Sequence, residues 1–338
     1  MTTATTRTAT MTNAKANTRD NRMNGAAMTS TIQRMLPAGL LGLLIVAGCG
    51  PTFDPASLVE GTRVVGARVE VDGAPERASP QPGETANVTW LVTAPGATPP
   101  LSWTFAVCPA GTGDAACLAA PLARFDGAST PRLSLAVPSA AQLGGATSLT
   151  LYGAICAGDD ALPQFDAQTA LATCPAGGKG TTVTFALALQ VGDDVNHNPT
   201  ADRGFTLDGV SWPVAAVDGD PCTQGPRVSA GSKGHLLGQV TQGSDREAYT
   251  ALMGAPPVAT PTRERLQLSR FTTAGKLKSQ FSFVEATDDS ASTAVAVTWD
   301  APEAADVPAA GAAVTFTFVV RDDRGGTDWT TRTLCVAP

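Results

Sequence analysis

The chain has 338 residues, and its 30 acidic residues outnumber its 23 basic residues, which gives a net charge of −7 at neutral pH. This charge excludes nucleic acid and anionic lipid headgroups as electrostatic partners, because both are negative themselves. The 34 glycines, the 25 prolines and a charged fraction of 16% favour many turns and few long helices. The length suits two domains of ordinary size.

The first informative element is an apolar run over Met35–Gly48. A membrane-spanning helix needs about 20 apolar residues, whereas the hydrophobic part of a secretory signal has roughly 7–15. Arg34 supplies the positive flank, and a start at Met28 would give a leader of ordinary proportions. We therefore expect residues 1–48 to be a signal peptide, in which residues 1–27 are an over-extended start or a disordered segment.

The apolar run ends in Val46-Ala47-Gly48-Cys49, which resembles the lipobox of bacterial lipoprotein precursors at all four positions. The resemblance implies diacylglyceryl modification of the Cys49 thiol, cleavage before Cys49 and fatty acylation of the new amino group. Gly50 stands where an aspartate would oppose sorting to the outer membrane. We expect a lipid-anchored protein of the cell envelope, at the outer membrane. The alternatives are an ordinary secretory signal with a chance cysteine, or an internal apolar strand.

The cysteine count indicates disulfide bonds. Seven cysteines become six once Cys49 is assigned to lipid, and an even number in an exported chain is typical of disulfides. Sequence alone leaves the pairing open, but local spacing and elimination favour Cys108–Cys117, Cys156–Cys174 and Cys222–Cys335. A zinc site is the alternative; no C-x-x-C motif occurs, and the only histidines are His197 and His235.

Short runs rich in β-branched and aromatic residues, bounded by Pro, Gly, Asp or Ser, predict strands along the whole mature chain. The expected strands of the first half are Arg63–Val71, Gly83–Val92, Leu101–Val107, Leu133–Val137, Ser148–Ile155 and Thr181–Val191. Those of the second half are Gly204–Val210, Leu236–Val240, Arg265–Phe271, Leu277–Phe283, Ala294–Trp299, Ala313–Val320 and Trp329–Val336. Apolar residues alternate along 183–191 and 314–320, which predicts strands with one buried face.

The segment Pro80–Glu84 before Val88–Val92 resembles the opening turn and strand of immunoglobulin-like domains, with Trp90 or Trp103 as the core aromatic residue. The hairpin over Arg321–Val336 resembles the end of immunoglobulin-like, PKD-like and cadherin-like repeats. The resemblances imply an all-β fold with two tandem immunoglobulin-like antiparallel β-sandwich domains.

Polar turn formers before Pro199 predict a boundary between the two domains. The expected organisation is a lipidated tether at 49–58, a first sandwich at 59–192, a linker at 193–200 and a second sandwich at 201–338 with a loop insertion at 212–262.

The linker is similar to the calcium-binding linker of cadherins, although His197 replaces an acid and one residue is missing before the proline. Calcium takes about 6–8 oxygen ligands, and the missing acid would make its binding weak. The alternative is a hydrogen-bonded linker rich in turns. The candidate ligands are Asp193, Asp194, Asn196 and Asn198. No other cofactor is expected.

Catalytic signatures are scarce, since no Gly-x-Ser-x-Gly motif occurs and both histidines lie in polar segments. We therefore expect no enzyme, but a non-catalytic adhesion, scaffold or recognition module that is held on the membrane by its lipid anchor. Its partner would be an envelope protein or a glycan. Ligand, leaflet and oligomeric state stay open.

Two alternative functions remain at this stage. The first is a glycan-binding or accessory subunit of an envelope complex, which would use an exposed Trp212. The second is a hydrolase with its site in residues 212–262, which a buried Ser–His–acid contact at His235 would favour. Core packing is the simpler expectation for Trp212 and Trp329, because the chain has few aromatic residues.

Overall fold

The computed structural model describes residues 55–338 except 159, 167, 176, 178, 179, 191 and 215–219. The expected signal peptide, the lipobox and Cys49 lie outside the described residues. Among the residues that are described, no helix has the length and apolarity needed to cross a bilayer. Phe53–Pro338 forms one compact unit.

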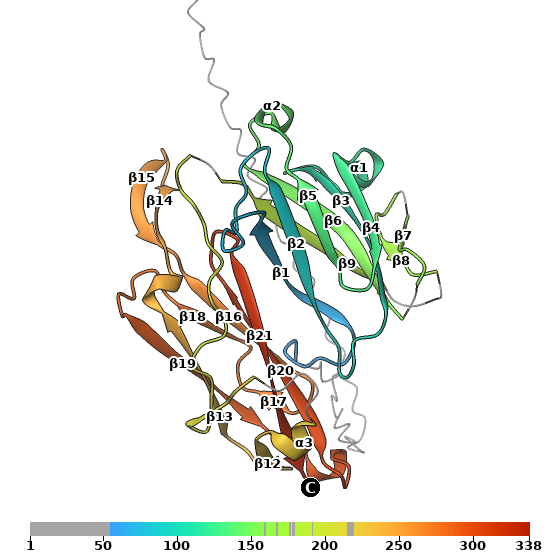
Figure 1. Cartoon of the computed structure of the whole chain (residues 1–338), viewed down its shortest axis with the longest axis vertical. Helices are drawn as coiled ribbons and strands as arrows, with labels where there is room; N and C mark the ends of the chain where they lie inside the picture. The colour runs from blue at the N-terminus through green and yellow to red at the C-terminus, as the bar shows by residue number, and fades with distance from the viewer. Residues whose placement is uncertain are drawn as a thin grey trace, which may run out of the picture. The chain divides into compact units, whose positions relative to one another are not determined.

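The first half of the described chain forms a sandwich of two antiparallel sheets, drawn in blue to green in Figure 1. One sheet has the strand order β1-β2-β5 and the other β4-β3-β6-β9. The strands are β1 (Arg63–Val71), β2 (Thr85–Thr93), β3 (Leu101–Pro109), β4 (Ala123–Ala128), β5 (Arg132–Ala136), β6 (Ser148–Ala157) and β9 (Gly180–Ala188). Smaller elements are α1 (Asp114–Ala119), α2 (Ala140–Leu143), β7 (Gln164–Phe165) and β8 (Ala172–Thr173).

Side chains from both sheets meet in one buried core. The rings of Trp90 and Phe105 come from opposite sheets and stack with their centroids 3.9 Å apart. Trp103 belongs to the same core, so both aromatic residues expected there are present. Along β9, Phe185 and Leu187 pack inward while the residues between them are more exposed, which confirms the predicted alternation.

The second half forms another pair of sheets, in yellow to red in Figure 1, with the orders β11-β10-β13-β19-β17 and β12-β21-β20-β16-β18. The first sheet contains β10 (Thr206–Leu207), β11 (Val210–Ser211), β13 (His235–Gln242), β17 (Lys276–Leu277) and β19 (Ser292–Asp300). The second contains β12 (Arg227–Ser229), β16 (Leu266–Thr272), β18 (Phe281–Val284), β20 (Ala312–Arg321) and β21 (Thr327–Ala337). Short helical turns are α3 (Pro221–Gln224), η1 (Gly243–Asp245) and η2 (Ala304–Asp306). Strand β12 joins β21 in parallel, whereas the other pairings of the two sheets are antiparallel.

Aromatic rings fill the core of the second sandwich. Trp212 and Trp299 lie edge-on to Phe316, with centroids 5.3 and 5.1 Å from its ring. Trp212 is 1% exposed, and its indole N–H donates to the carbonyl oxygen of Thr333 at 3.2 Å. The expected core role of Trp212 is thus confirmed, and an exposed sugar platform at that residue is ruled out.

Residues 212–262, which we expected to be a loop insertion, contribute strands to both sheets. Strand β13 lies between β10 and β19, and β12 lies at the edge beside β21. What extends beyond the sandwich is the hairpin of β14 (Ala248–Met253) and β15 (Val258–Arg263), whose strands pair only with each other among the described strands. The all-β prediction itself is confirmed.

The two sandwiches touch through an apolar cluster. Val65 and Leu91 of the first sandwich pack with Val319 and Trp329 of the second. The guanidinium of Arg68 pairs with the Asp328 carboxylate beside this cluster. Consequently β20 is buried on both faces near its end, which an isolated sandwich strand would not be.

The end of the expected tether is part of the folded unit. The N–H of Val59 donates to the carbonyl oxygen of Thr272 at 2.8 Å, and the N–H of Thr272 donates to that of Ser57 at 2.9 Å. These bonds add the segment to the end of β16 before the chain enters the first sandwich. Ser57, Leu58 and Val59 therefore belong to the folded unit and not to a free tether.

All six cysteines of the described residues form disulfides, in the pairing that spacing favoured: Cys108–Cys117, Cys156–Cys174 and Cys222–Cys335. The third bond closes a separation of 113 residues and ties α3 to the last strand.

Loop length predicts unequal contributions from these bonds. Replacing Cys222 and Cys335 by serine should lower the free energy of unfolding by about 5 kcal/mol, against about 3 kcal/mol for Cys108 and Cys117, because the longer loop restricts the unfolded chain more. Urea unfolding of the two double variants measures the difference. Equal losses, or a larger loss for the short loop, would contradict this ranking.

Candidate functional site

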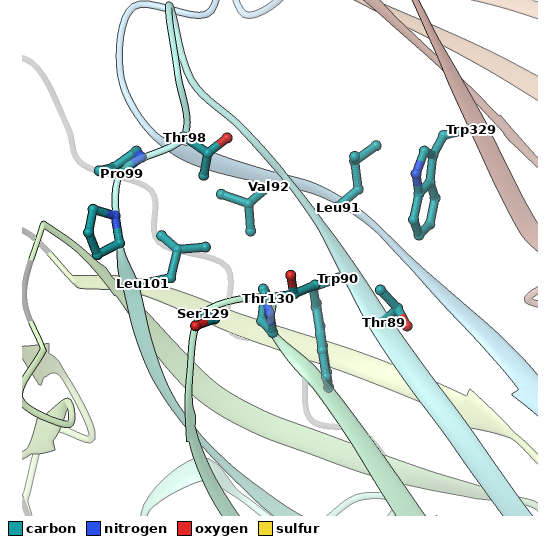
Figure 2. A pocket seen from close by; sticks show the side chains of 12 residues that line it. Thr89, Trp90, Leu91, Val92, Thr98, Pro99, Leu101, Ser129, Thr130 and Trp329 are labelled. Carbon is teal, nitrogen blue, oxygen red and sulfur yellow. The ribbon is translucent and has the colours of Figure 1, made fainter. Parts of the chain in front are cut away.

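An open cleft of about 700 Å³ lies between β2 and β21. Figure 2 shows the Trp329 ring beside Leu91, while the Trp90 side chain leaves β2 on the opposite side. The remaining wall comes from the β2–β3 connection and the turn before β5. The lining residues are Thr89, Trp90, Leu91, Val92, Thr98, Pro99, Pro100, Leu101, Ser129, Thr130, Pro131 and Trp329.

The lining of the cleft is uncharged. Its polar groups are the hydroxyls of Thr89, Thr98, Ser129 and Thr130, and its apolar surface is supplied by Trp329 with prolines and aliphatic residues. Such a surface suits a neutral ligand, because a buried charge on the ligand would lose its hydration without gaining an ionic partner.

The linker residues that we named as candidate calcium ligands lie in different environments. Asp193 and Asp194 are exposed, whereas Asn196 is 1% exposed. The Asn198 amide donates to the carbonyl oxygen of Val69 at 2.7 Å and accepts from the Thr327 N–H at 2.9 Å. Both of its polar ends are therefore occupied by backbone groups of the two sandwiches. No group of three His, Cys, Asp or Glu side chains within the described part of the chain could hold a metal ion. Calcium stays a prediction.

A cluster of charged side chains lies against the linker; we call His197, Glu247, Glu264 and Arg324 the linker cluster. Glu247 contacts the His197 ring nitrogen Nδ1 and accepts from the His197 backbone N–H at 3.0 Å. Arg324 Nη1 lies 3.1 Å from Glu264 Oε1 and 3.7 Å from Glu247 Oε2. One cation thus faces two carboxyl groups, one of which, Glu264, is wholly buried.

Burial raises the pKa of Glu264 to about 8. The hydrogen bond from the Glu247 N–H works against this rise, the carboxylates of Asp322 and Glu247 add to it, and Arg324 again opposes it. Nothing in the sequence marked these two acids, because Glu247 lies in the range expected to be loop and Glu264 lies between that range and the next expected strand.

His235 takes part in a second polar group, a contact with a serine and an acid that differs from the buried one expected of a hydrolase, because the acid's side chain is 47% exposed. Its Nε2 lies 2.7 Å from Ser232 Oγ, and its Nδ1 lies 2.7 Å from Asp208 Oδ2. Asp208 Oδ1 also accepts from the Leu236 N–H at 2.7 Å. We call Ser232, His235 and Asp208 the Ser–His–Asp group.

Local chain geometry brings these three residues together. Ser232 lies in the turn between β12 and β13, and His235 begins β13. Asp208 and Gly209 both have positive φ, at 51° and 82°, as the Asp-Gly hairpin turn between β10 and β11 requires. Since β10 pairs with β13, this turn lies beside the start of β13.

A scan against protein-family models found no matching family, and a search of the curated proteins found no match. The functional inference therefore rests on geometry.

The raised pKa of Glu264 predicts a pH-dependent stability. The carboxyl is neutral in the folded protein up to about pH 8 but ionises above 4.5 in the unfolded chain. The folded state therefore holds an extra proton between these values, and the free energy of unfolding should fall as pH rises through that window, by at most about 5 kcal/mol.

Denaturant unfolding at pH 5, 6, 7 and 8 measures this dependence. Glu264→Gln keeps an acceptor for the Glu247 N–H and should flatten the curve, whereas Glu285→Gln, at a carboxyl whose side chain is 59% exposed, should leave it unchanged. A Glu264→Gln curve as steep as that of the wild type would refute the assignment.

Proposed function

We propose that this chain is an envelope lipoprotein, anchored through Cys49, whose two immunoglobulin-like sandwiches present the cleft as a recognition site for a neutral partner. The observation that carries the recognition role is the uncharged cleft with Trp329 beside hydroxyl-bearing residues. An aromatic ring with an apolar surround supplies much of the free energy in protein recognition.

Two observations support the extracytoplasmic location. Three disulfides are typical of an oxidising compartment and are rare in the cytosol. Because these bonds occupy the six cysteines after Cys49, that residue is the remaining thiol for lipid. Outer-membrane sorting is part of the proposal and rests on Gly50.

The folded unit begins close to the proposed anchor. Ser57 already accepts a hydrogen bond from Thr272, and it lies eight residues after Cys49 in the chain. An extended chain covers at most about 3.5 Å per residue, so Ser57 would lie within about 28 Å of the lipidated sulfur. A recognition module held this near the bilayer would meet partners of the same membrane or of the adjacent envelope layer.

The partner favoured here is an extended segment of an envelope protein, because the cleft is open and is lined by rigid prolines. A neutral glycan is the second candidate, since an indole ring and nearby hydroxyls are groups on which sugars bind. In this alternative the sugar would bind on the ring of Trp329, because Trp212 is buried.

The lipid anchor is tested by replacing Cys49 with serine. The wild-type chain should partition with the membrane fraction and carry acyl mass on its N-terminal peptide, whereas the variant should lose both properties. Mass spectrometry of detergent-extracted protein reports both. An unmodified Cys49 in mature, membrane-bound protein would overturn the anchor.

The cleft is tested by a photo-crosslinking amino acid at Thr130, with Val210, which is 70% exposed outside the cleft, as the matched control position. A discrete crosslinked protein should form in cells from position 130 and not from 210, and Trp329→Ala should reduce it about tenfold or more. Binding to a neutral-glycan array that Trp329→Ala abolishes would favour the second candidate. Identical products from both positions, unaffected by Trp329→Ala, would contradict the cleft as recognition site.

A further inference from the structure

The Ser–His–Asp group has the connectivity of an acyl-transfer site. A serine hydroxyl reaches one imidazole nitrogen at 2.7 Å, and a carboxylate reaches the other nitrogen at 2.7 Å. Both distances fall within the hydrogen-bond range in which a nucleophile and its general base exchange a proton. This arrangement is recognised by geometry and by roles, and it recurs on unrelated folds.

The hydrogen-bond pattern fixes the imidazole tautomer. Burial of Asp208 opposes its ionisation, but the hydrogen bonds from His235 and the Leu236 N–H hold its pKa below the usual value. An ionised carboxylate can only accept, so Nδ1 of His235 carries the proton. In the neutral imidazole with this tautomer, Nε2 is an acceptor and can take the proton of the Ser232 hydroxyl.

The turn that carries Ser232 is held in place by backbone hydrogen bonds. The Ala301 N–H donates to the Ser232 carbonyl oxygen at 2.9 Å, and the Gly231 N–H donates to that of Pro302 at 2.7 Å. The His235 ring lies 5.9 Å from the Trp299 ring. Nucleophile and base are thus positioned before any substrate arrives, which favours reaction from the bound state.

We propose that Ser232 is a nucleophile for small carboxylic esters, that His235 is its general base, and that Asp208 is a positioning residue. Ser232 Oγ bonds to the ester carbonyl carbon while its proton passes to His235 Nε2. The bond from that carbon to the alcohol oxygen breaks, and the leaving alcohol takes the proton. Water then attacks the acyl-serine, His235 again takes and returns a proton, and the carboxylic acid leaves.

The surroundings of Ser232 limit the substrate class. Lys233 is exposed and follows the nucleophile, so its N–H and ammonium are the donors that this turn offers to a developing oxyanion. Asp300 and Glu303 lie near the turn, paired with Lys278 at 2.8 Å and with Lys233 at 3.6 Å. Missing one good oxyanion donor costs about 100- to 1,000-fold in rate, so esters with good leaving groups are the expected substrates.

One feature of the turn opposes catalysis. Ser232 Oγ also contacts the carbonyl oxygen of Ser229, which competes with His235 for the hydroxyl proton. This activity is independent of the recognition cleft and departs from the expectation that the chain is no enzyme.

The test uses the purified full chain in detergent, with p-nitrophenyl acetate as substrate and a fluorophosphonate probe that labels activated serines. The wild-type protein should hydrolyse the ester and take one label at Ser232, located by peptide mapping. Ser232→Ala should lose the label and about 100-fold of kcat/KM, and Ser232→Cys should retain acylation. Ser229→Ala, in the same turn without a histidine contact, should behave as the wild type.

Asp208→Asn tests the positioning role. It should lower kcat with KM unchanged, because it disturbs the imidazole rather than substrate binding. An unlabelled wild-type Ser232, or equal hydrolysis by wild type and Ser232→Ala with thermal unfolding unchanged, would overturn the proposal. Partner binding at the cleft should be the same in these variants as in the wild type, so either result leaves the proposed recognition function untouched.

Discussion

The contact between the two sandwiches is the constraint on which the other features depend. Val319 of β20 packs on Val65 of β1, and the Arg321 guanidinium donates to the carbonyl oxygen of Val65. This contact buries the face of β20 that would otherwise meet water. Removing apolar surface from water contributes about 25 cal/mol per Å², so the contact stabilises the packing of one sandwich on the other. The Arg68–Asp328 ion pair at the rim of this contact orients the two sandwiches more than it contributes to the free energy of unfolding.

The cleft exists because of this contact. Trp329 belongs to β21 and faces Leu91 of β2 only while the two sheets stay together. At the linker, the amide of Asn198 bonds to Val69 in one sandwich and to Thr327 in the other. The amide of Asn198 thus joins the two sandwiches through bonds to backbone groups of both. A neutral Glu264 beside Arg324 makes the same junction sensitive to pH.

Most strand positions could be predicted from the sequence because β-branched residues, turn formers and alternation are local signals. Strand β20 is an example, since Val314, Phe316 and Phe318 alternate and all are buried. The expected strands Gly204–Val210 and Leu277–Phe283 were wrong, because the structure divides each between two short strands. Strand β4 was missed because it contains Gly127, a residue that normally weakens a strand. The glycine is required by tertiary packing, because a Cβ at position 127 would lie 2.2 Å from the Trp103 ring.

The sites were much less predictable than the strands. Disulfide pairing followed from spacing, but the cleft and the Ser–His–Asp group join residues that are far apart in sequence. Asp208 reaches His235 only because β10 pairs with β13, and no local motif encodes that pairing. Likewise the linker cluster needs Glu247 and Glu264, which flank the hairpin β14–β15. Long-range strand pairing, and not residue type, determines where these sites form.

Differential scanning calorimetry of the purified chain tests the central claim most directly. If the contact between the sandwiches fixes their arrangement, the protein should unfold in one transition whose calorimetric and van't Hoff enthalpies agree. Val65→Asp, which places a charge in the apolar contact, should split it into two. Two separate transitions in the wild-type protein, unchanged by Val65→Asp, would contradict the claim.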